Sequence, residues 1–287
     1  MHKSVLLKES TEALGLAPGK IFLDATFGAG GHTKEVLGRY PGAKVIAMDQ
    51  DPEAVLRALE IPGVTAVREN FRNLDKALRE LGVTKIHAIL FDLGISSDQL
   101  ESSGRGFSFL RDEPLDMRMS ERGIPAKDIL NSWNENALEL VLRGFGEEKF
   151  SRRIARAIVA RREKKPFETT GDLVEAVLEA RPANPREKIH PATKTFQAIR
   201  IATNDELTSL EEGLRKGFEA LESKGRLVAI SFHSLEDRIV KNFFRDLVKK
   251  GVAERVGKSA KPERPSEEEI RENPRSRSAK LRVIEKL

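Results

Sequence analysis

A glycine-rich turn between a strand pattern and a helical pattern constrains this chain more than any other segment. An apolar run ends in Asp24, the glycines Gly28, Gly30 and Gly31 follow, and a helical pattern opens at Thr33. Glycine adopts positive φ angles at little cost and lets a ligand approach the backbone. The free N–H groups of the first helical turn then face whatever docks there. This order predicts a cofactor-binding turn in an α/β fold.

The first hundred residues continue this alternation of strands and helices. Strands are predicted over residues 21–25, 44–49, 64–68 and 88–93, and helices over residues 33–39, 52–60 and 74–81. Repeated βαβ units of this kind predict a parallel, doubly wound sheet with right-handed connections. Its ligands are expected at the carboxyl ends of the strands.

The alternation stops near residue 104 and resumes about a hundred residues later. Helices alone are predicted over residues 129–133, 135–143, 150–164, 170–179 and 192–214, followed by a strand at 226–232, a helix at 235–250 and strands at 252–256 and 281–286. The last two strands, joined by a long charged loop, predict an antiparallel hairpin. We therefore expect an α/β domain of residues 1–104 and 204–287, interrupted by a helical domain of residues 105–203. Three consecutive domains are the alternative, but three short C-terminal strands make a marginal sheet.

Composition narrows the class of protein. Of the 287 residues, 39% are hydrophobic and 33% are charged, which is typical of a globular chain. No apolar run is long enough to cross a bilayer, and the N-terminus lacks the pattern of a signal peptide, so a cytoplasmic location is expected. The chain has no cysteine, which excludes disulfides, thiolate ligands and a cysteine nucleophile. No metal site is predicted.

The turn does not fit a dinucleotide. That fingerprint requires a third small residue at its sixth position, where this chain has Thr33. The acid before the turn, Asp24, would repel a pyrophosphate but suits a ligand that carries an ammonium and a sulfonium group. A nicotinamide dehydrogenase is therefore the weakest of the candidate functions.

Residues at successive strand ends complete a different pattern. Asp49 is placed to accept hydrogen bonds from ribose hydroxyls, Phe71 to border an adenine, and Asp92 to face the substrate. The ordered set matches S-adenosylmethionine better than NAD. Simpler interpretations stay open: Asp49 as a helix cap, Asp92 as a turn cap, and His32 as a surface or capping residue.

Four segments resemble the MraW/RsmH family of bacterial ribosomal RNA small subunit methyltransferases. They cover residues 24–32, 92–100, 105–109 with 114–119, and 231–238. The resemblance implies a Rossmann-like S-adenosylmethionine-dependent methyltransferase sheet with an inserted all-helical domain. It also implies methyl transfer to N4 of a cytidine in 16S ribosomal RNA, free or in the small subunit. The cofactor contacts that it implies are Gly30, Gly31, His32, Asp49, Phe71, Asp92 and Gln99.

The chemistry itself favours an amine acceptor. Methylation at C5 of cytosine needs a covalent nucleophile, normally cysteine, whereas an exocyclic amine can attack the methyl group directly. Asp92 is the candidate catalytic residue, followed by Leu-Gly where many amino-methyltransferases have Pro-Pro-Tyr. We expect Asp92 to orient the cofactor or the amine, with Phe107 or Phe109 stacking on the base. His233 is the other candidate general base.

Basic residues cluster in one predicted helix. Residues 149–165 contain eight Lys or Arg and one acid. The residues predicted to contact RNA phosphates are Arg152, Arg153, Arg156 and Arg162 on this helix, with Arg105 and Arg118 beside the cleft. A solvated helix face without a partner is the alternative.

Two other functions share much of this pattern. An amino-methyltransferase for DNA or another RNA is the nearest. An RNA-binding or assembly factor that senses S-adenosylmethionine without turnover is the other, and a methyl-transfer assay distinguishes it.

Overall fold

The computed structural model describes residues 4–181, 189–257 and 261–287, and it divides the chain into two compact units. We call Met1–Gly94 with Leu207–Leu287 the sheet unit, and Ile95–Glu206 the helical unit. The insertion therefore begins ten residues before the predicted position of 105 and ends three residues after 203. The difference places Gln99 in the helical unit.

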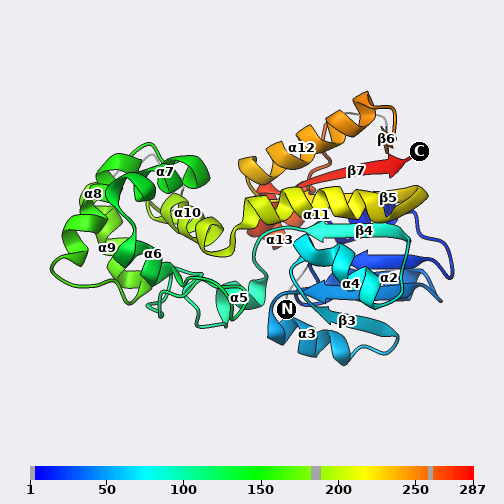
Figure 1. Ribbon diagram of the computed structural model, residues 1–287, viewed down its shortest axis with the longest axis horizontal. Coiled ribbons are helices and arrows are strands. Elements are labelled where there is room, and N and C mark those ends of the chain that lie inside the picture. The colour runs from blue at the N-terminus through cyan, green and yellow to red at the C-terminus, as the bar shows by residue number, and fades with distance from the viewer. Residues whose placement is uncertain (1–3, 182–188, 258–260) are drawn as a thin grey trace. The chain divides into compact units, whose positions relative to one another are not determined.

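The sheet unit is built on seven strands in the order β3-β2-β1-β4-β5-β7-β6 (Figure 1). The strands are β1 (Ile21–Asp24), β2 (Lys44–Asp49), β3 (Val64–Arg68), β4 (Ile86–Asp92), β5 (Leu221–Ser231), β6 (Ala253–Arg255) and β7 (Lys280–Lys286). The pairs among β1 to β5 are parallel, whereas β7 pairs antiparallel with both β5 and β6. The predicted parallel sheet and its antiparallel C-terminal hairpin are confirmed.

Both faces of this sheet are covered by helices. The helices of the unit are α1 (Leu7–Ala13), α2 (Gly31–Arg39), α3 (Pro52–Leu59), α4 (Leu74–Glu80), α11 (Glu206–Ala220), α12 (Ser234–Lys249) and α13 (Glu267–Glu272). Along β4, Ile89 and Phe91 pack with residues of α4, α11 and α12, while Ala88 and Leu90 pack with residues of α1 and α2. Side chains of a strand alternate between the two faces, so a strand covered on both sides is apolar throughout.

The helical unit has a core of its own. Its helices are α5 (Ser97–Glu101), α6 (Ala126–Ser132), α7 (Glu135–Gly146), α8 (Ser151–Arg162), α9 (Thr170–Ala180) and α10 (Thr193–Asn204). Leu115, Leu142, Ile158 and Phe167 are among its fully buried side chains. The unit therefore meets the main requirement of a domain, which is a separate apolar interior.

The short helices α1 and α5 were not predicted, β5 begins earlier than predicted, and two further elements differ from the prediction. The helix predicted over 192–214 is two helices, because Asp205 adopts a left-handed conformation (φ 48°) between α10 and α11. The predicted loop after residue 257 contains α13, which begins at the cap Ser266. Residues 258–260 of that loop lie outside the described residues.

Candidate cofactor and substrate site

The glycine turn connects β1 to α2 and cannot accept side chains at its key positions. Gly28 and Gly30 have positive φ angles of 54° and 78°. A Cβ on Gly30 would lie 2.5 Å from the ring of Phe27, and one on Gly31 would collide with Ser4 Oγ. The backbone of the turn is therefore bare because both conformation and space require glycine.

Asp24 stabilises this turn from the protein interior. Its carboxylate is 1% exposed, and its Oδ2 accepts a hydrogen bond of 2.7 Å from the Thr33 hydroxyl. Burial raises the pKa of Asp24 above its usual value. Thr33, the residue that excludes a dinucleotide fingerprint, thus serves to satisfy a buried acid.

Asp49, at the end of β2, holds two backbone N–H groups. Gly28 N donates to its Oδ2 at 2.8 Å, and Asp51 N donates to its Oδ1 at 2.9 Å. Burial raises the pKa of Asp49 to about 6. The cap of α3 is Asp51, which accepts from Glu53 N. Asp49 is therefore not the helix cap, and its remaining lone pairs can accept hydroxyl groups.

Phe71 follows β3 and is half-buried against the sheet. Its ring meets that of Phe91 edge to face, with centroids 5.5 Å apart. Gly213 on α11 makes room for it, since a Cβ there would lie 2.6 Å from Phe71 Cδ2. The sheet and α11 together fix the position of this aromatic side chain.

Asp92 ends β4 and lies beside His32, the first residue after the glycine pair. His32 Nε2 is 3.3 Å from Asp92 Oδ2, without the alignment of a hydrogen bond. Asp92 Oδ1 is a buried oxygen with no hydrogen-bond partner among the described residues. Its backbone N–H donates to the Thr26 hydroxyl at 2.7 Å. Asp92 is thus no turn cap, and its carboxylate is available to a ligand.

His32 is buried, not a surface or capping residue. It is 6% exposed, and its Nδ1 lies 3.1 Å from the hydroxyl of Ser10, which is fully buried on α1. Burial opposes a charged imidazolium, but the neighbouring carboxylates of Asp92 and Asp24 raise the pKa of His32. The sequence carried no signal for Ser10, because the short helix α1 was not predicted.

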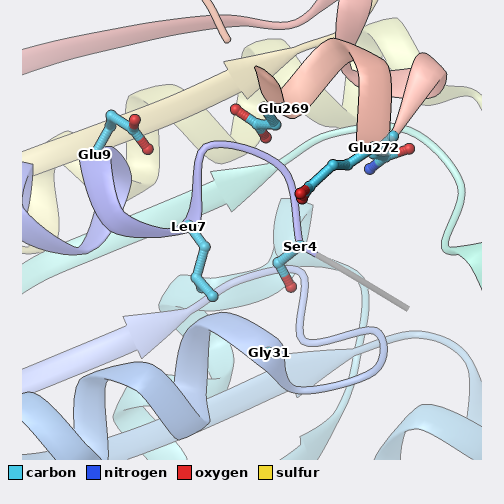
Figure 2. Close-up of a pocket in the computed structure, with 7 residues that line it drawn as sticks. Ser4, Leu7, Glu9, Gly31, Glu269 and Glu272 are labelled. Atoms are coloured by element: carbon cyan, nitrogen blue, oxygen red, sulfur yellow. The ribbon is translucent and has the colours of Figure 1, made fainter. Parts of the chain in front are cut away.

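A cavity of about 350 Å³ borders Gly31, the second glycine of the pair. Its lining residues are Ser4, Leu7, Glu9, Gly31, Glu269, Glu272 and Asn273. Figure 2 shows the carboxylates of Glu269 and Glu272, from α13, above the amino-terminal segment and Gly31 below it. Glu269 already has a protein partner, because its Oε1 accepts a hydrogen bond of 2.7 Å from Leu6 N. The cavity shares only Gly31 with the predicted cofactor residues.

Two further predicted site residues act as helix caps. Gln99 and Ser96 form a capping box at the start of α5. His233 caps α12: Glu236 N donates to its Nδ1, and its Nε2 lies 3.1 Å from Glu236 Oε1. A neutral imidazole has one lone pair, and here a backbone N–H occupies it. This geometry argues against His233 as a general base.

Three of the six predicted RNA contacts are exposed on α8, namely Arg152, Arg153 and Arg156. Arg153 lies over the Phe150 ring, and Arg156 is 3.8 Å from Glu135. The aliphatic stripe Ile154, Ala155 and Ile158 faces the core, as the periodicity indicated.

The other three predicted RNA contacts, Arg162, Arg105 and Arg118, form hydrogen bonds to groups within the helical unit. Arg162 donates to the carbonyls of Leu130 and Trp133, so the prediction that it points outward is wrong. Arg105 donates to the Arg118 carbonyl, and Arg118 forms a two-pronged pair with Asp116.

The candidate stacking rings differ in exposure. Phe107 is 5% exposed in the core of the helical unit, which removes it as a stacking surface for a base. Phe109 is half-buried and stacks on His190 with ring centroids 4.7 Å apart.

Comparison with known proteins agrees with this arrangement. The model of the MraW methylase family matches residues 1–287. The chain belongs to the MraW methylase family. A relative in Brevibacillus brevis is 44% identical over 100% of this chain and 98% of its own length, and one in Deinococcus radiodurans is 48% identical over 99% and 89%. Another, in Sulfurihydrogenibium sp., is 48% identical over 98% of both chains. All three MraW relatives are named ribosomal RNA small subunit methyltransferase H.

Among the described residues, no helix is both long enough and apolar enough to cross a bilayer.

Proposed function

We propose that this protein transfers a methyl group from S-adenosylmethionine to N4 of a cytidine in 16S ribosomal RNA. The observation that carries the proposal is the Asp92 carboxylate, which ends β4 beside the glycine turn with one buried oxygen unpaired among the described residues. A buried, unpaired carboxylate oxygen is costly in free energy. Such an oxygen is retained where a bound ligand supplies its missing hydrogen bond.

The residues of the sheet unit fit S-adenosylmethionine. Gly30 and Gly31 offer a bare backbone, Asp49 offers carboxylate lone pairs for the ribose, and Phe71 offers an apolar edge for the adenine. His32 and Asp92 lie at the end where the sulfonium and amino groups would be. When bound, the cofactor supplies an electrophilic methyl group.

Asp92 acts on the acceptor in this proposal. The lone pair of an exocyclic amine is delocalised into the cytosine ring, so acceptors must be aimed at its N–H groups to make it a nucleophile. In this proposal the carboxylate of Asp92 and the backbone carbonyls of Leu93 and Gly94 accept from these N–H groups. Direct attack needs no covalent enzyme intermediate, in keeping with a chain that has no cysteine.

The relatives' names support the choice of RNA. Within the chain, the exposed arginines of α8 support it independently. We propose that Arg152, Arg153 and Arg156 contact phosphates, because three adjacent guanidinium groups on one helix face suit a polyanion. Phe109 is the proposed stacking ring for the target base.

The test is methyl transfer from methyl-labelled S-adenosylmethionine to naked 16S ribosomal RNA and, in parallel, to small subunits. We expect label in at least one of the two, and loss of label with Asp92→Asn while circular dichroism shows an intact fold. Cofactor binding without transfer to either substrate would contradict the proposal and favour a sensing function.

A further inference from the structure

Ser10 is buried behind the predicted methyl-donor end of the site. Its hydroxyl has two neighbours: His32 Nδ1 at 3.1 Å and the Leu7 carbonyl oxygen at 3.2 Å. A hydroxyl group has one proton to donate and lone pairs with which to accept. It can therefore face a ring nitrogen with or without a proton.

The two states of His32 use this freedom differently. When the ring is neutral, the hydroxyl donates to Nδ1. When the ring is an imidazolium, the hydroxyl accepts from Nδ1–H and donates to Leu7 O. In both states Nε2 carries a proton toward Asp92 Oδ2, 3.3 Å away. His32 can thus gain or lose one proton without leaving a buried polar atom unpaired on the α1 side.

The groups that face His32 favour the charged state when no cation is bound. Asp92 lies at the end of β4 and Asp24 at the end of β1, whereas α1 contributes the neutral hydroxyl of Ser10. Two carboxylates around one buried ring stabilise a positive charge there. A sulfonium docked against Asp92 would supply that charge instead, and two adjacent cations repel each other.

We propose that Ser10 is a positioning residue of the cofactor site, which lets His32 hold a proton in the cofactor-free protein and release it when the cationic cofactor binds. The proton leaves Nδ1 for solvent, and the hydroxyl of Ser10 turns to donate to the vacated lone pair. This inference rests on the proposed binding of S-adenosylmethionine. It does not rest on methyl transfer or on the RNA substrate.

Calorimetry tests the inference. The heat of S-adenosylmethionine binding, compared between phosphate and Tris buffers at several pH values from 6 to 8, gives the number of protons released. We expect a maximum release of about one proton, and up to about a tenfold gain in affinity per pH unit below the pKa of His32. S-adenosylhomocysteine, whose sulfur is uncharged, should release fewer.

Variants of α1 separate positioning from simple packing. Ser10→Ala removes a hydrogen bond from both states of the ring, but the charged ring loses the stronger, charge-assisted one, so the release should move down by about one pH unit. Thr11→Val is the matched control: it removes another fully buried hydroxyl of α1, which donates to Leu7 O and, among the described residues, forms no hydrogen bond with His32. It should behave as wild type. Equal behaviour of both variants and wild type would overturn the inference.

The cofactor-free protein supplies an independent readout. Nitrogen-15 chemical shifts of the histidine rings report which nitrogens carry protons, and His32→Asn assigns the signal among the five histidines. We expect His32 to carry protons on both nitrogens at pH 6, below the ordinary pKa of histidine, with a lower pKa in Ser10→Ala. A neutral His32 at pH 6 would overturn the inference. Failure of S-adenosylmethionine to bind would instead contradict the proposed function and leave this readout intact.

Discussion

Gly213→Ala tests whether the position of Phe71 sets the affinity for the cofactor. The new Cβ would lie 2.6 Å from Phe71 Cδ2, where ordinary contact begins at 3.4 Å, so the ring must withdraw by close to the difference. Overpacking of this kind costs about 1–3 kcal/mol, and alanine in place of glycine returns about 1 kcal/mol through helix propensity. The net loss of folding stability is therefore about 0–2 kcal/mol, a range too wide to be diagnostic.

Cofactor affinity is the diagnostic quantity. Well-placed aromatic contacts are worth about 0.5–1.5 kcal/mol, so a displaced ring should raise the dissociation constant for S-adenosylmethionine by about threefold to tenfold. Isothermal titration calorimetry measures it. Phe71→Leu should weaken binding to a similar extent, and the double variant should add little to either single one.

Gly217→Ala is the control on the same helix. Its Cβ would meet Ile89 Cδ1 at 3.0 Å and the Phe91 ring at 3.3 Å, with Phe71 not among its nearest neighbours. Whatever its effect on the melting temperature, it should leave the affinity for S-adenosylmethionine close to that of the wild type. Wild-type affinity in both Gly213→Ala and Phe71→Leu, or equal losses in the two glycine variants, would refute the reasoning.

Three further predictions concern pH, capping and salt. Because burial raises the pKa of Asp49 to about 6, the affinity for S-adenosylmethionine should fall as the pH drops through that value and a proton neutralises the acceptor. Calorimetry should show that this pH dependence is lost in Asp49→Asn. An unchanged pH dependence in Asp49→Asn would count against Asp49 as a cofactor contact. His233→Ala should lower stability in chemical denaturation by about 1 kcal/mol through loss of the α12 cap but retain turnover per folded molecule, whereas a hundredfold loss of kcat would restore it as a catalytic residue. Replacing Arg152, Arg153 and Arg156 together by Gln should reduce the slope of log affinity for 16S ribosomal RNA against log salt by about 2 in filter-binding assays, and an unaltered slope would reject this face.

Much of the sheet could be predicted from the sequence because its signals are local. Strands β2 and β3 have the predicted bounds, and the glycine turn lies between β1 and α2 as expected. The short strand-forming runs and the glycines each depend on a few adjacent residues. The helix predicted over 192–214 failed for the same reason: apolar periodicity continues through Asp205, and only its left-handed backbone separates α10 from α11.

The partners of the site residues could not be predicted, because they depend on segments that are distant in the chain. Arg162 has the spacing of an outward residue, yet carbonyls of α6 and the residue after it capture its guanidinium group. Asp24 has the position of an acid that faces a ligand, yet its carboxylate is hydrogen-bonded by the hydroxyl of Thr33. Ser10 meets His32 only because α1 packs beside α2. A guanidinium or hydroxyl group binds whatever acceptor the fold brings near, and a single sequence does not encode that choice locally.

Identification of the methylated nucleoside tests the central claim most directly. After transfer from S-adenosylmethionine to 16S ribosomal RNA or small subunits, the RNA is digested to nucleosides and analysed by mass spectrometry against standards. We predict a single product, N4-methylcytidine, absent with Asp92→Asn. Methyl label recovered in 5-methylcytidine, or in a nucleoside other than cytidine, would contradict attack by the exocyclic amine at Asp92.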